Sequence, residues 1–394
     1  VMPGDATRRS PQEWCHIGVW PGWHTAPMRW SVGQIADVVG GSVTAGDPSA
    51  LVDSATNDSR TARPGALFVA IRAERDGHDF VAAAAAAGAT AALSARPAAA
   101  LGALPAGFSV VEVDDTERAL GELGSAGRAR FDGRVVVGIT GSVGKTSTKD
   151  LLASVLGQDR PTHASEKSFN NELGVPLTIL DAPDRTEALE LEMGARGVGH
   201  IARLCAVGRP TVGIVTSVGH AHTSEFGTLE GVARAKGELV EALPSSAAGG
   251  VAVLNARNPH VAGMAARTEA EVVWFTPPSA VVAGEARGPG PAAGPHVMAE
   301  DVRLDDDLVP RFHVRSDWGS VAVELGARGL HLVDNALAAA AAALAVGVPL
   351  DAVAAGLAAP VLSPMRMALV RTPAGVRVID DTYNANPMSV AAAL

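Results

Sequence analysis

The sequence predicts an α/β protein built around a doubly wound, mainly parallel sheet, and three observations support this. From residue 134 onward, short apolar runs alternate with helical stretches, which is the order of parallel βαβ units. A glycine-rich turn that ends in Gly-Lys-Thr joins one apolar run to a helix. Hydrophobic residues make up 47% of the 394 residues and aromatic residues only 4%, so we expect cores of Ala, Val, Leu and Ile.

The first 27 residues differ from the rest of the chain. They contain three of the six tryptophans, show no sustained hydrophobic period and lack the basic-then-apolar order of a signal peptide. An amphipathic helical pattern begins only after Met28. We therefore expect residues 1–27 to be a disordered or non-native leader.

Residues 28–125 predict a small α/β domain. Gly65–Ile71 and Phe108–Asp115 are apolar runs of strand length. Residues 79–93 read as a helix, a glycine stop and a strand, and a further helix is expected from Thr116.

Residues 126–362 predict a larger central α/β domain. Its buried-strand candidates are Arg134–Gly141, Glu187–Gly194, Thr211–Val218, Gly249–Asn255 and Ala270–Thr276. A Pro- and Gly-rich loop is expected at residues 284–296, extra strands up to about residue 326, and a long helix from Val333.

Residues 363–394 predict the start of a third domain. Residues 359–367 read as a linker, and residues 375–387 as a strand followed by a loop. The chain stops inside what reads as the next helix, and one strand with half a helix cannot bury a core. We therefore expect most of this third domain to be missing from the chain.

Composition excludes several classes of protein. The net charge of −10 argues against a general nucleic-acid binder, which usually carries a basic face. Cys15 and Cys205 give neither a disulfide framework nor a metal-finger spacing, so a reducing cytoplasm is the expected location. No apolar run reaches the ~18–20 residues of a membrane span.

The turn between the strand at 134–141 and the next helix is a candidate phosphate-binding loop. Backbone N–H groups at the N-terminus of a helix suit phosphate oxygens. Lys145 would reach the terminal phosphates and Thr146 a magnesium ion. Ile139 stands where the common pattern G-x-x-x-x-G-K-[ST] has its first glycine, so the loop is a shorter variant. The residues assigned to it are Thr140, Gly141, Ser142, Val143, Gly144, Lys145, Thr146 and Ser147.

Five segments in a fixed order resemble one family. They are TGSVGKTSTKD (140–150), SFNNELGVPLTIL (168–180), LEMG (191–194), AHTSEFGT with AKGEL (221–239) and DDTYNANP (380–387). In this order they are similar to the Mur ligases, the ATP-dependent amide-forming enzymes of peptidoglycan precursor synthesis. The segment TNDSRTARPGALFVAIRAERDGHDF (56–80) is also similar to a substrate-binding domain of that family.

The resemblance implies an activity and a three-domain architecture. The domains would be a UDP-sugar-peptide-binding domain, a central ATP-binding domain and a C-terminal Rossmann-like domain. ATP would phosphorylate the carboxylate of UDP-N-acetylmuramoyl-tripeptide, and the amine of D-alanyl-D-alanine would then attack the acyl phosphate. ATP and Mg²⁺ are the implied cofactors, and a monomer is expected.

The resemblance also implies a metal site. Glu192 at a strand end, Thr146 and His222 would bind Mg²⁺. His222, rather than His220, precedes the segment that matches the family's H-x-x-x-F-G pattern. Lys236 matches the family lysine that reacts with CO₂ to form a carbamate; the alternative is an ordinary surface lysine. The chain has only four lysines among its 32 basic residues, which makes this position notable.

Other site residues follow from the same motifs. Asn170 and Asn171 would lie beside the acyl phosphate, with capping of a turn or helix as the alternative. The residues implied in nucleotide binding are Asn255, His331, Asn335, Arg366, Asp380, Asp381, Tyr383, Asn384 and Asn386. The residues implied in binding the UDP-sugar peptide are Ser59, Arg60, Asp76, Gly77, His78 and Asp79, with plain surface turns as the alternative.

Three other interpretations stay open from the sequence alone. One is the related ligase that adds the diamino acid, although that enzyme usually carries a DYAHTP-like segment at 380–387. Folylpolyglutamate synthetase is a second, but it lacks a comparable N-terminal domain. The third is an inactive or regulatory nucleotide-binding protein.

Overall fold

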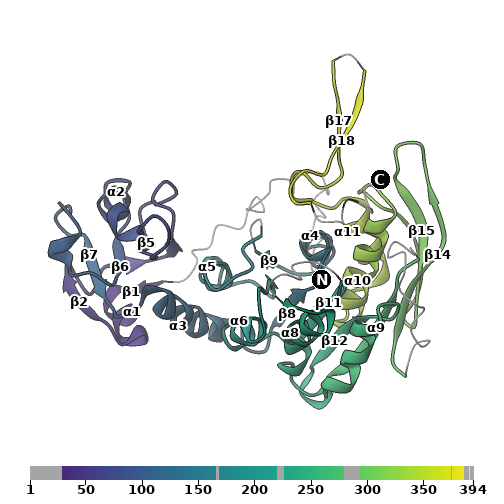
Figure 1. Cartoon of the computed structure of the whole chain (residues 1–394), viewed down its shortest axis with the longest axis horizontal. Coiled ribbons are helices and arrows are strands. Elements are labelled where there is room, and N and C mark those ends of the chain that lie inside the picture. Colours follow the sequence, from purple (N-terminus) through teal and green to yellow (C-terminus); the bar gives the residue numbers. More distant parts are fainter. Residues whose placement is uncertain are drawn as a thin grey trace, which may run out of the picture.

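Two sheets joined by a long helix organise the chain (Figure 1). This computed structural model describes residues 29–165, 168–219, 226–278, 293–373, 375–385 and 390. The first sheet has five strands and the second has nine, and helix α3 (Thr116–Arg128) runs from one to the other. Helix α3 therefore crosses the predicted domain boundary at residues 125 and 126. The predicted leader, residues 1–27, lies outside the described residues.

The N-terminal sheet has the strand order β2-β7-β6-β5-β4, and its last four strands run parallel. Its strands are β2 (Ser42–Ala45), β4 (Ser54–Thr56), β5 (Ala66–Val69), β6 (Ala91–Ser94) and β7 (Ser109–Glu112). A small pair of strands, β1 (Trp30–Ser31) and β3 (Leu51–Val52), lies beside it. Helices α1 (Val32–Val39) and α2 (Val81–Ala86) complete this unit.

Local sequence signals begin and end helix α1. The Ser31 hydroxyl accepts the N–H of Gln34, and the Gln34 side chain accepts the N–H of Ser31, which is a capping box. Gly40 ends the helix in the left-handed conformation. The amphipathic pattern predicted after Met28 is therefore realised here.

The central sheet has the strand order β16-β15-β14-β13-β12-β11-β8-β10-β9. Its strands are β8 (Val135–Thr140), β9 (Thr162–Ala164), β10 (Ala188–Glu192), β11 (Val212–Val215), β12 (Val251–Asn255), β13 (Glu271–Thr276), β14 (His296–Leu304), β15 (Pro310–Ser316) and β16 (Gly319–Glu324). In this order, the strands from β14 through β8 to β9 all run parallel to one another. Strand β14 pairs antiparallel with β15, and β15 pairs antiparallel with β16. The predicted mainly parallel sheet is confirmed.

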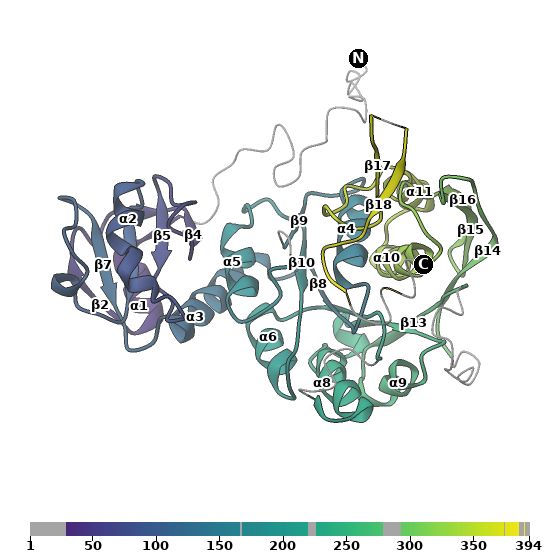
Figure 2. The same cartoon turned by 45° about the horizontal axis from the view of Figure 1, so that its top comes forward.

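Helices cover both faces of the central sheet (Figure 2). One layer consists of α4 (Lys145–Leu156), α10 (His331–Ala345) and α11 (Leu350–Ala358). The other consists of α5 (Gly174–Asp181), α6 (His200–Gly208), α8 (Leu229–Glu241) and α9 (Pro259–Ala262). Val136 and Val137 on β8 enter different cores, because successive side chains of a strand point to opposite faces.

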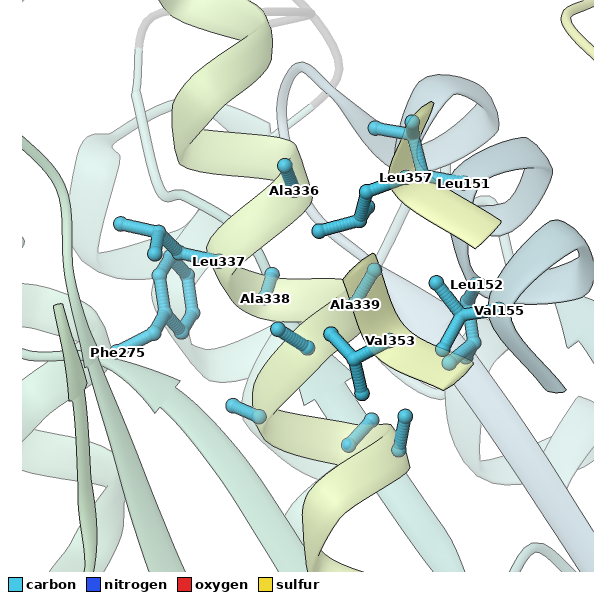
Figure 3. Close-up of a cluster of buried hydrophobic side chains, with 14 of the residues drawn as sticks. Leu151, Leu152, Val155, Phe275, Ala336, Leu337, Ala338, Ala339, Val353 and Leu357 are labelled. Carbon is cyan, nitrogen blue, oxygen red and sulfur yellow. The ribbon is translucent and has the colours of Figure 1, made fainter. Parts of the chain in front are cut away.

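Helix α10 is buried on all sides. Its run Ala338–Ala343 is at most 1% exposed, so each face contacts protein. Figure 3 shows Leu337 pointing towards Phe275 of the sheet, while Val353 of α11 points towards Val155 of α4. The helix begins two residues before the predicted start at Val333.

The C-terminal segment forms a hairpin that projects from the central unit (Figure 1). Strand β18 (Arg377–Asp380) is the predicted strand, and it pairs antiparallel with β17 (Ala368–Arg371), which the sequence analysis did not predict. Arg371 and Arg377 both bind the carboxylate of Asp307, with N–O distances of 3.1 and 2.9 Å. These bonds connect the hairpin to the turn between β14 and β15.

We predict that Gly356→Ala destabilises the central unit. A Cβ at Gly356 of α11 would overlap backbone atoms of Val155 in α4. Overpacking of this kind costs about 1–3 kcal/mol, and the measurement is urea-induced unfolding. Gly121→Ala in α3 is the matched control, since that Cβ meets open space. The control should gain up to about 1 kcal/mol, and equal effects of the two changes would contradict the packing argument.

Candidate nucleotide and metal site

The ends of four parallel strands meet at one edge of the central sheet. Strands β8, β10, β11 and β12 run in the same direction, so their carboxyl ends share this edge. The loop after β8 leads directly into helix α4, as expected for a phosphate-binding turn. Ligands of open α/β sheets bind at this edge. The predicted phosphate loop therefore occupies the expected place.

Two glycines of the loop are required by its surroundings. Gly144 has a φ of +83°, and a Cβ there would overlap the side-chain oxygen of Asn335. A Cβ at Gly141 would overlap the hydroxyl of Thr216. The structure thus brings Asn335, predicted to contact the nucleotide, next to the loop, and adds Thr216, which the sequence analysis missed.

The segment after β11 is hydrogen-bonded to the phosphate loop. The N–H of Ser142 donates to the carbonyl of Ser217 at 2.9 Å, and the N–H of Val143 donates to the Ser217 hydroxyl at 3.3 Å. Asn255 donates to the carbonyl of Thr216 at 3.0 Å. Asn255, predicted to contact the nucleotide, therefore also positions this segment. His222 and Asn386 lie outside the described residues.

Glu192 is the buried carboxylate of the site and is 1% exposed. Its Oε2 accepts the hydroxyl proton of Thr146 at 2.8 Å, and its Oε1 accepts a proton from the Asn170 amide at 2.8 Å. A hydroxyl and a carboxylate side by side are oxygen ligands of the kind that Mg²⁺ prefers. The residues present therefore fit a magnesium ion at this position.

Two lysines lie next to one another at this site. Burial, together with the neighbouring charge of Lys145, lowers the pKa of Lys236 well below its ordinary value. Burial also lowers the pKa of Lys145, and the charge of Arg366 adds to this, although Glu192 opposes it. Lys236 is 5% exposed on helix α8, which contradicts the alternative of a surface lysine.

Asn170 and Asn171 have different surroundings. Asn170 contacts Glu192, as described above, whereas Asn171 accepts the N–H of Gly174 at 2.9 Å at the start of α5. The geometry of Asn171 is thus the capping alternative raised from the sequence. Its side-chain oxygen is occupied by this backbone contact.

The linker and the C-terminal loop approach the same edge. The guanidinium carbon of Arg366 lies 4.5 Å from the ring centre of Tyr383, which is a cation–π contact. The Tyr383 hydroxyl lies 2.7 Å from the Ser168 hydroxyl, close to Asn170. Asp381 accepts the N–H of Met367 at 3.2 Å and so positions the linker. Asn384 is exposed.

The remaining predicted nucleotide residues flank these groups. His331 begins helix α10, four residues before Asn335, so both lie on one face of the helix. Asp380 accepts the N–H and the hydroxyl proton of Thr382 at 3.1 and 2.6 Å. Asp380 therefore shapes the loop that carries Tyr383.

The predicted substrate loops of the N-terminal unit lie at the carboxyl ends of β4 and β5. His78 is 1% exposed; its Nδ1 lies 2.6 Å from Asp76, and its Nε2 accepts the N–H of Ala95 at 2.9 Å. Both ring nitrogens are therefore used within the protein. Gly77 packs against the backbone of Ile71, and a Cβ there would overlap it.

The charged ends of these loops are more accessible. Asp79 pairs with Arg96 at 2.9 Å and is 64% exposed. Arg60 is 87% exposed and pairs with Asp58 at 2.6 Å, next to Ser59. Arg60 and Asp79 can thus reach a ligand, whereas His78 can only hold the loop in place.

Family profiles match both units. A profile of the Mur ligase middle domain matches residues 139–343, which is more than half of the chain. A second profile, of the Mur ligase family catalytic domain, matches residues 52–128. The chain belongs to the Mur ligase family. The predicted resemblance is therefore confirmed.

Individual Mur ligases are similar over most of their length. UDP-N-acetylmuramoyl-tripeptide–D-alanyl-D-alanine ligase of Mycobacterium tuberculosis is 42% identical over 92% of this chain and 72% of its own length. The crystal structure of MurF from Acinetobacter baumannii has a TM-score of 0.79 and 31% identity, covering 93% of this chain and 76% of its own. MurF ligase from Thermotoga maritima, in complex with ADP, has a TM-score of 0.69 and 27% identity, covering 86% and 73%.

In this Mur ligase, the site combines a phosphate loop with the buried carboxylate of Glu192 and the cationic side chains of Lys145 and Arg366. Such a site suits a nucleotide whose phosphates supply negative charge. Among the residues that the structure describes, no helix has both the length and the hydrophobicity needed to cross a bilayer.

We predict that Gly144→Ala weakens ATP binding at least about tenfold, because a methyl group would overlap Asn335 and the left-handed backbone disfavours alanine. The measurement is isothermal titration with Mg·ATP. Gly133→Ala is the matched control, since Gly133 also has a positive φ but its Cβ would meet open space. Equal weakening in both variants would show that backbone strain alone is responsible.

We predict a pH-dependent stabilisation by Asp76. Hydrogen bonds from the backbone and ring of His78 lower the pKa of Asp76 to about 2 from 3.8. Because the folded-state pKa is depressed, this contribution is complete above about pH 4 and is lost as pH falls towards 2. Asp76→Asn should therefore lower the urea midpoint at pH 6, and its difference from the wild type should shrink below pH 4. Asp79→Asn, in the same loop, is the matched control and should lower the midpoint at pH 6 less than Asp76→Asn does.

Proposed function

We propose that this Mur ligase joins D-alanyl-D-alanine to UDP-N-acetylmuramoyl-tripeptide with consumption of ATP. The observation that carries the proposal is the neighbouring pair of lysines: Lys145 of the phosphate loop, which is close to the charge of Glu192, and the buried Lys236 of α8. Lys145 lies in the segment TGSVGKTSTKD and Lys236 in the segment AKGEL, and both segments resemble motifs of the Mur ligases. The relatives with 36–42% identity, from Escherichia coli and mycobacteria, all carry the name of this ligase.

The proposed reaction has two chemical steps. A carboxylate oxygen of the tripeptide attacks the terminal phosphorus of ATP, and ADP leaves. The neutral amine of D-alanyl-D-alanine then attacks the acyl carbon, and the tetrahedral intermediate expels phosphate as the amide forms. The amine loses one proton in this step.

The chain's residues would serve these steps by charge and position. The N–H groups of the loop and Lys145 would hold the transferred phosphoryl group, whose negative charge they offset. Asn170, fixed by its bond to Glu192, would orient the acyl group. A magnesium ion held by Thr146 and Glu192 would neutralise phosphate charge when bound.

Lys236 would act as a carbamate. Its neutral amine attacks CO₂ and releases a proton, and the product is an anion that can bind a cation. A lowered pKa keeps the amine neutral at lower pH and so favours this reaction. Arg60, Ser59 and Asp79 would contact the UDP-sugar peptide from the N-terminal unit, while Asn335 and His331 would contact the nucleotide.

The proposed activity is tested by phosphate release from ATP. UDP-N-acetylmuramoyl-tripeptide is supplied with D-alanyl-D-alanine, with D-alanine alone, or with a diamino acid. The proposal expects release with the dipeptide well above release with either single amino acid. Faster release with UDP-N-acetylmuramoyl-dipeptide and a diamino acid would instead support the related ligase. Release with a folate and glutamate would support folylpolyglutamate synthetase.

We predict that Lys236→Ala lowers kcat by about a hundredfold or more, because the anion that would hold a cation is lost. Formate or acetate should restore part of the activity, since a small carboxylic acid can occupy the place of the carbamate. Lys236→Arg is the matched control: it keeps a cation but cannot react with CO₂, so no rescue is expected. Wild-type activity in Lys236→Ala, or equal rescue of both variants, would disprove the carbamate role.

A further inference from the structure

The linker after α11 is fastened to the phosphate-loop helix α4 by two side chains. The N–H of Ser363 donates to Oδ2 of Asp150 at 2.7 Å, and the N–H of Val361 donates to the hydroxyl of Ser154 at 3.0 Å. Asp150 and Ser154 are four residues apart, so they lie on one face of α4. Alternate backbone amides of the linker are thus held at two fixed points of this helix. Leu362, between them, packs against the core.

Asp150 is well suited to hold the linker in a fixed position. It is 7% exposed, and its other oxygen lies 3.2 Å from the ammonium group of Lys149. Lys149 in turn donates to the carbonyl of Ser165 at 2.5 Å, and the Ser165 hydroxyl accepts the N–H of Glu192 at 3.3 Å. Hydrogen bonds to a buried, ionised acceptor are stronger than neutral ones. The anchor of the linker is therefore continuous with the strand that carries Glu192.

The chain makes a strained turn directly after this anchor. Met365 and Met367 have φ values of +58° and +50°, a left-handed backbone conformation that residues with a side chain adopt only at an energetic cost. Met367 is 4% exposed in the core, and its N–H is bound by Asp381. Arg366 thus stands between two left-handed residues, with the chain held on both sides of the turn.

Arg366 lies near the phosphate loop. Its charge is close enough to contribute to the lowered pKa of Lys145. Its Nε atom is buried and has no hydrogen-bond partner among the residues that the structure describes. The guanidinium stacks on Tyr383, which leaves the donors at its edge for a ligand. A buried cationic donor beside a phosphate loop suits a phosphate oxygen.

We propose that Asp150 is a positioning residue that holds Arg366 against the terminal phosphates of the nucleotide, acting through Ser363 and the turn at residues 365–367. This role of Asp150 deepens the proposed function. It depends on that function in one respect only, namely that ATP is the ligand. Helix α4 would then contact the nucleotide twice: directly through its N-terminus, and indirectly through the linker that Asp150 and Ser154 hold.

The test is a double-mutant cycle with Asp150→Ala, Arg366→Ala and the double variant. The measurement is the Kd for Mg·ATP by isothermal titration. We expect each single change to weaken binding about tenfold, and the double variant to be within about twofold of Arg366→Ala. Losses that multiply to about a hundredfold would show that Asp150 does not act through Arg366 and would overturn the inference. Unchanged binding in Asp150→Ala would overturn it as well.

Ser154→Ala gives a second cycle that does not disturb the buried charge pair. It should weaken ATP binding about threefold in the wild-type background and not measurably in Arg366→Ala. Independent losses in this cycle would overturn the inference even if Asp150→Ala does not fold. Asp159→Asn, an exposed carboxylate just beyond α4, is the matched control and should bind ATP like the wild type.

The cycle separates this inference from the proposed function. Because it measures nucleotide binding, a chain that binds ATP but forms no amide would contradict the proposed function alone. A chain that forms the amide but shows no coupling between Asp150 and Arg366 would contradict the inference alone.

Discussion

The arrangement of the site depends on the buried carboxylate of Glu192, because it joins the phosphate loop to the segment before α5. One oxygen is bound by Thr146 of the phosphate loop and the other by Asn170 of the loop before α5. Its backbone N–H is bound by Ser165. The phosphate loop and the segment that contains Ser165 and Asn170, which are distant from Glu192 in sequence, therefore meet at this residue. A carboxylate this well bonded stays in place, which a metal ligand requires.

Positive charge lies close to this carboxylate. Lys145 and Arg366 lie close to one another at the phosphate loop, and burial lowers the pKa of Lys145 and of its neighbour Lys236. Without phosphate, the site is therefore short of negative charge. ATP supplies that charge, and a carbamate on Lys236 would supply more of it. Electrostatics thus links nucleotide binding to the modification proposed for the lysine.

Much of this fold follows from local sequence patterns. The apolar runs that became β8, β10, β11, β12 and β13 are short and continuous, because parallel strands are buried on both faces. The phosphate loop is recognisable because only glycine fits beside Asn335 and Thr216. Strand β17 escaped prediction because its four residues follow directly on a linker and are too few to show a period, although it pairs with β18 across a turn of five residues.

The site was less accessible to sequence reasoning, because the contacts are made by neighbours that the motifs do not contain. Thr216 and Ser165 are common residue types in loops, and only tertiary structure places them against Gly141 and Glu192. Asn171 looks like Asn170 in sequence, yet its oxygen caps α5. Glu190 has the same strand parity as Glu192, but both of its oxygens are buried and have no hydrogen-bond partner within the part of the chain that the structure describes. Burial raises the pKa of Glu190 well above the ordinary value.

The alanine run of α10 has a consequence for how this protein can move. Alanine has no rotamers, so the layer between α10, α4 and the sheet has few side-chain rearrangements available to it (Figure 3). Shear between packed helices usually depends on such rearrangements. Helix α4 and the sheet must therefore shift together as one rigid block. A change in the relative position of the two units would then take place at helix α3, which joins them.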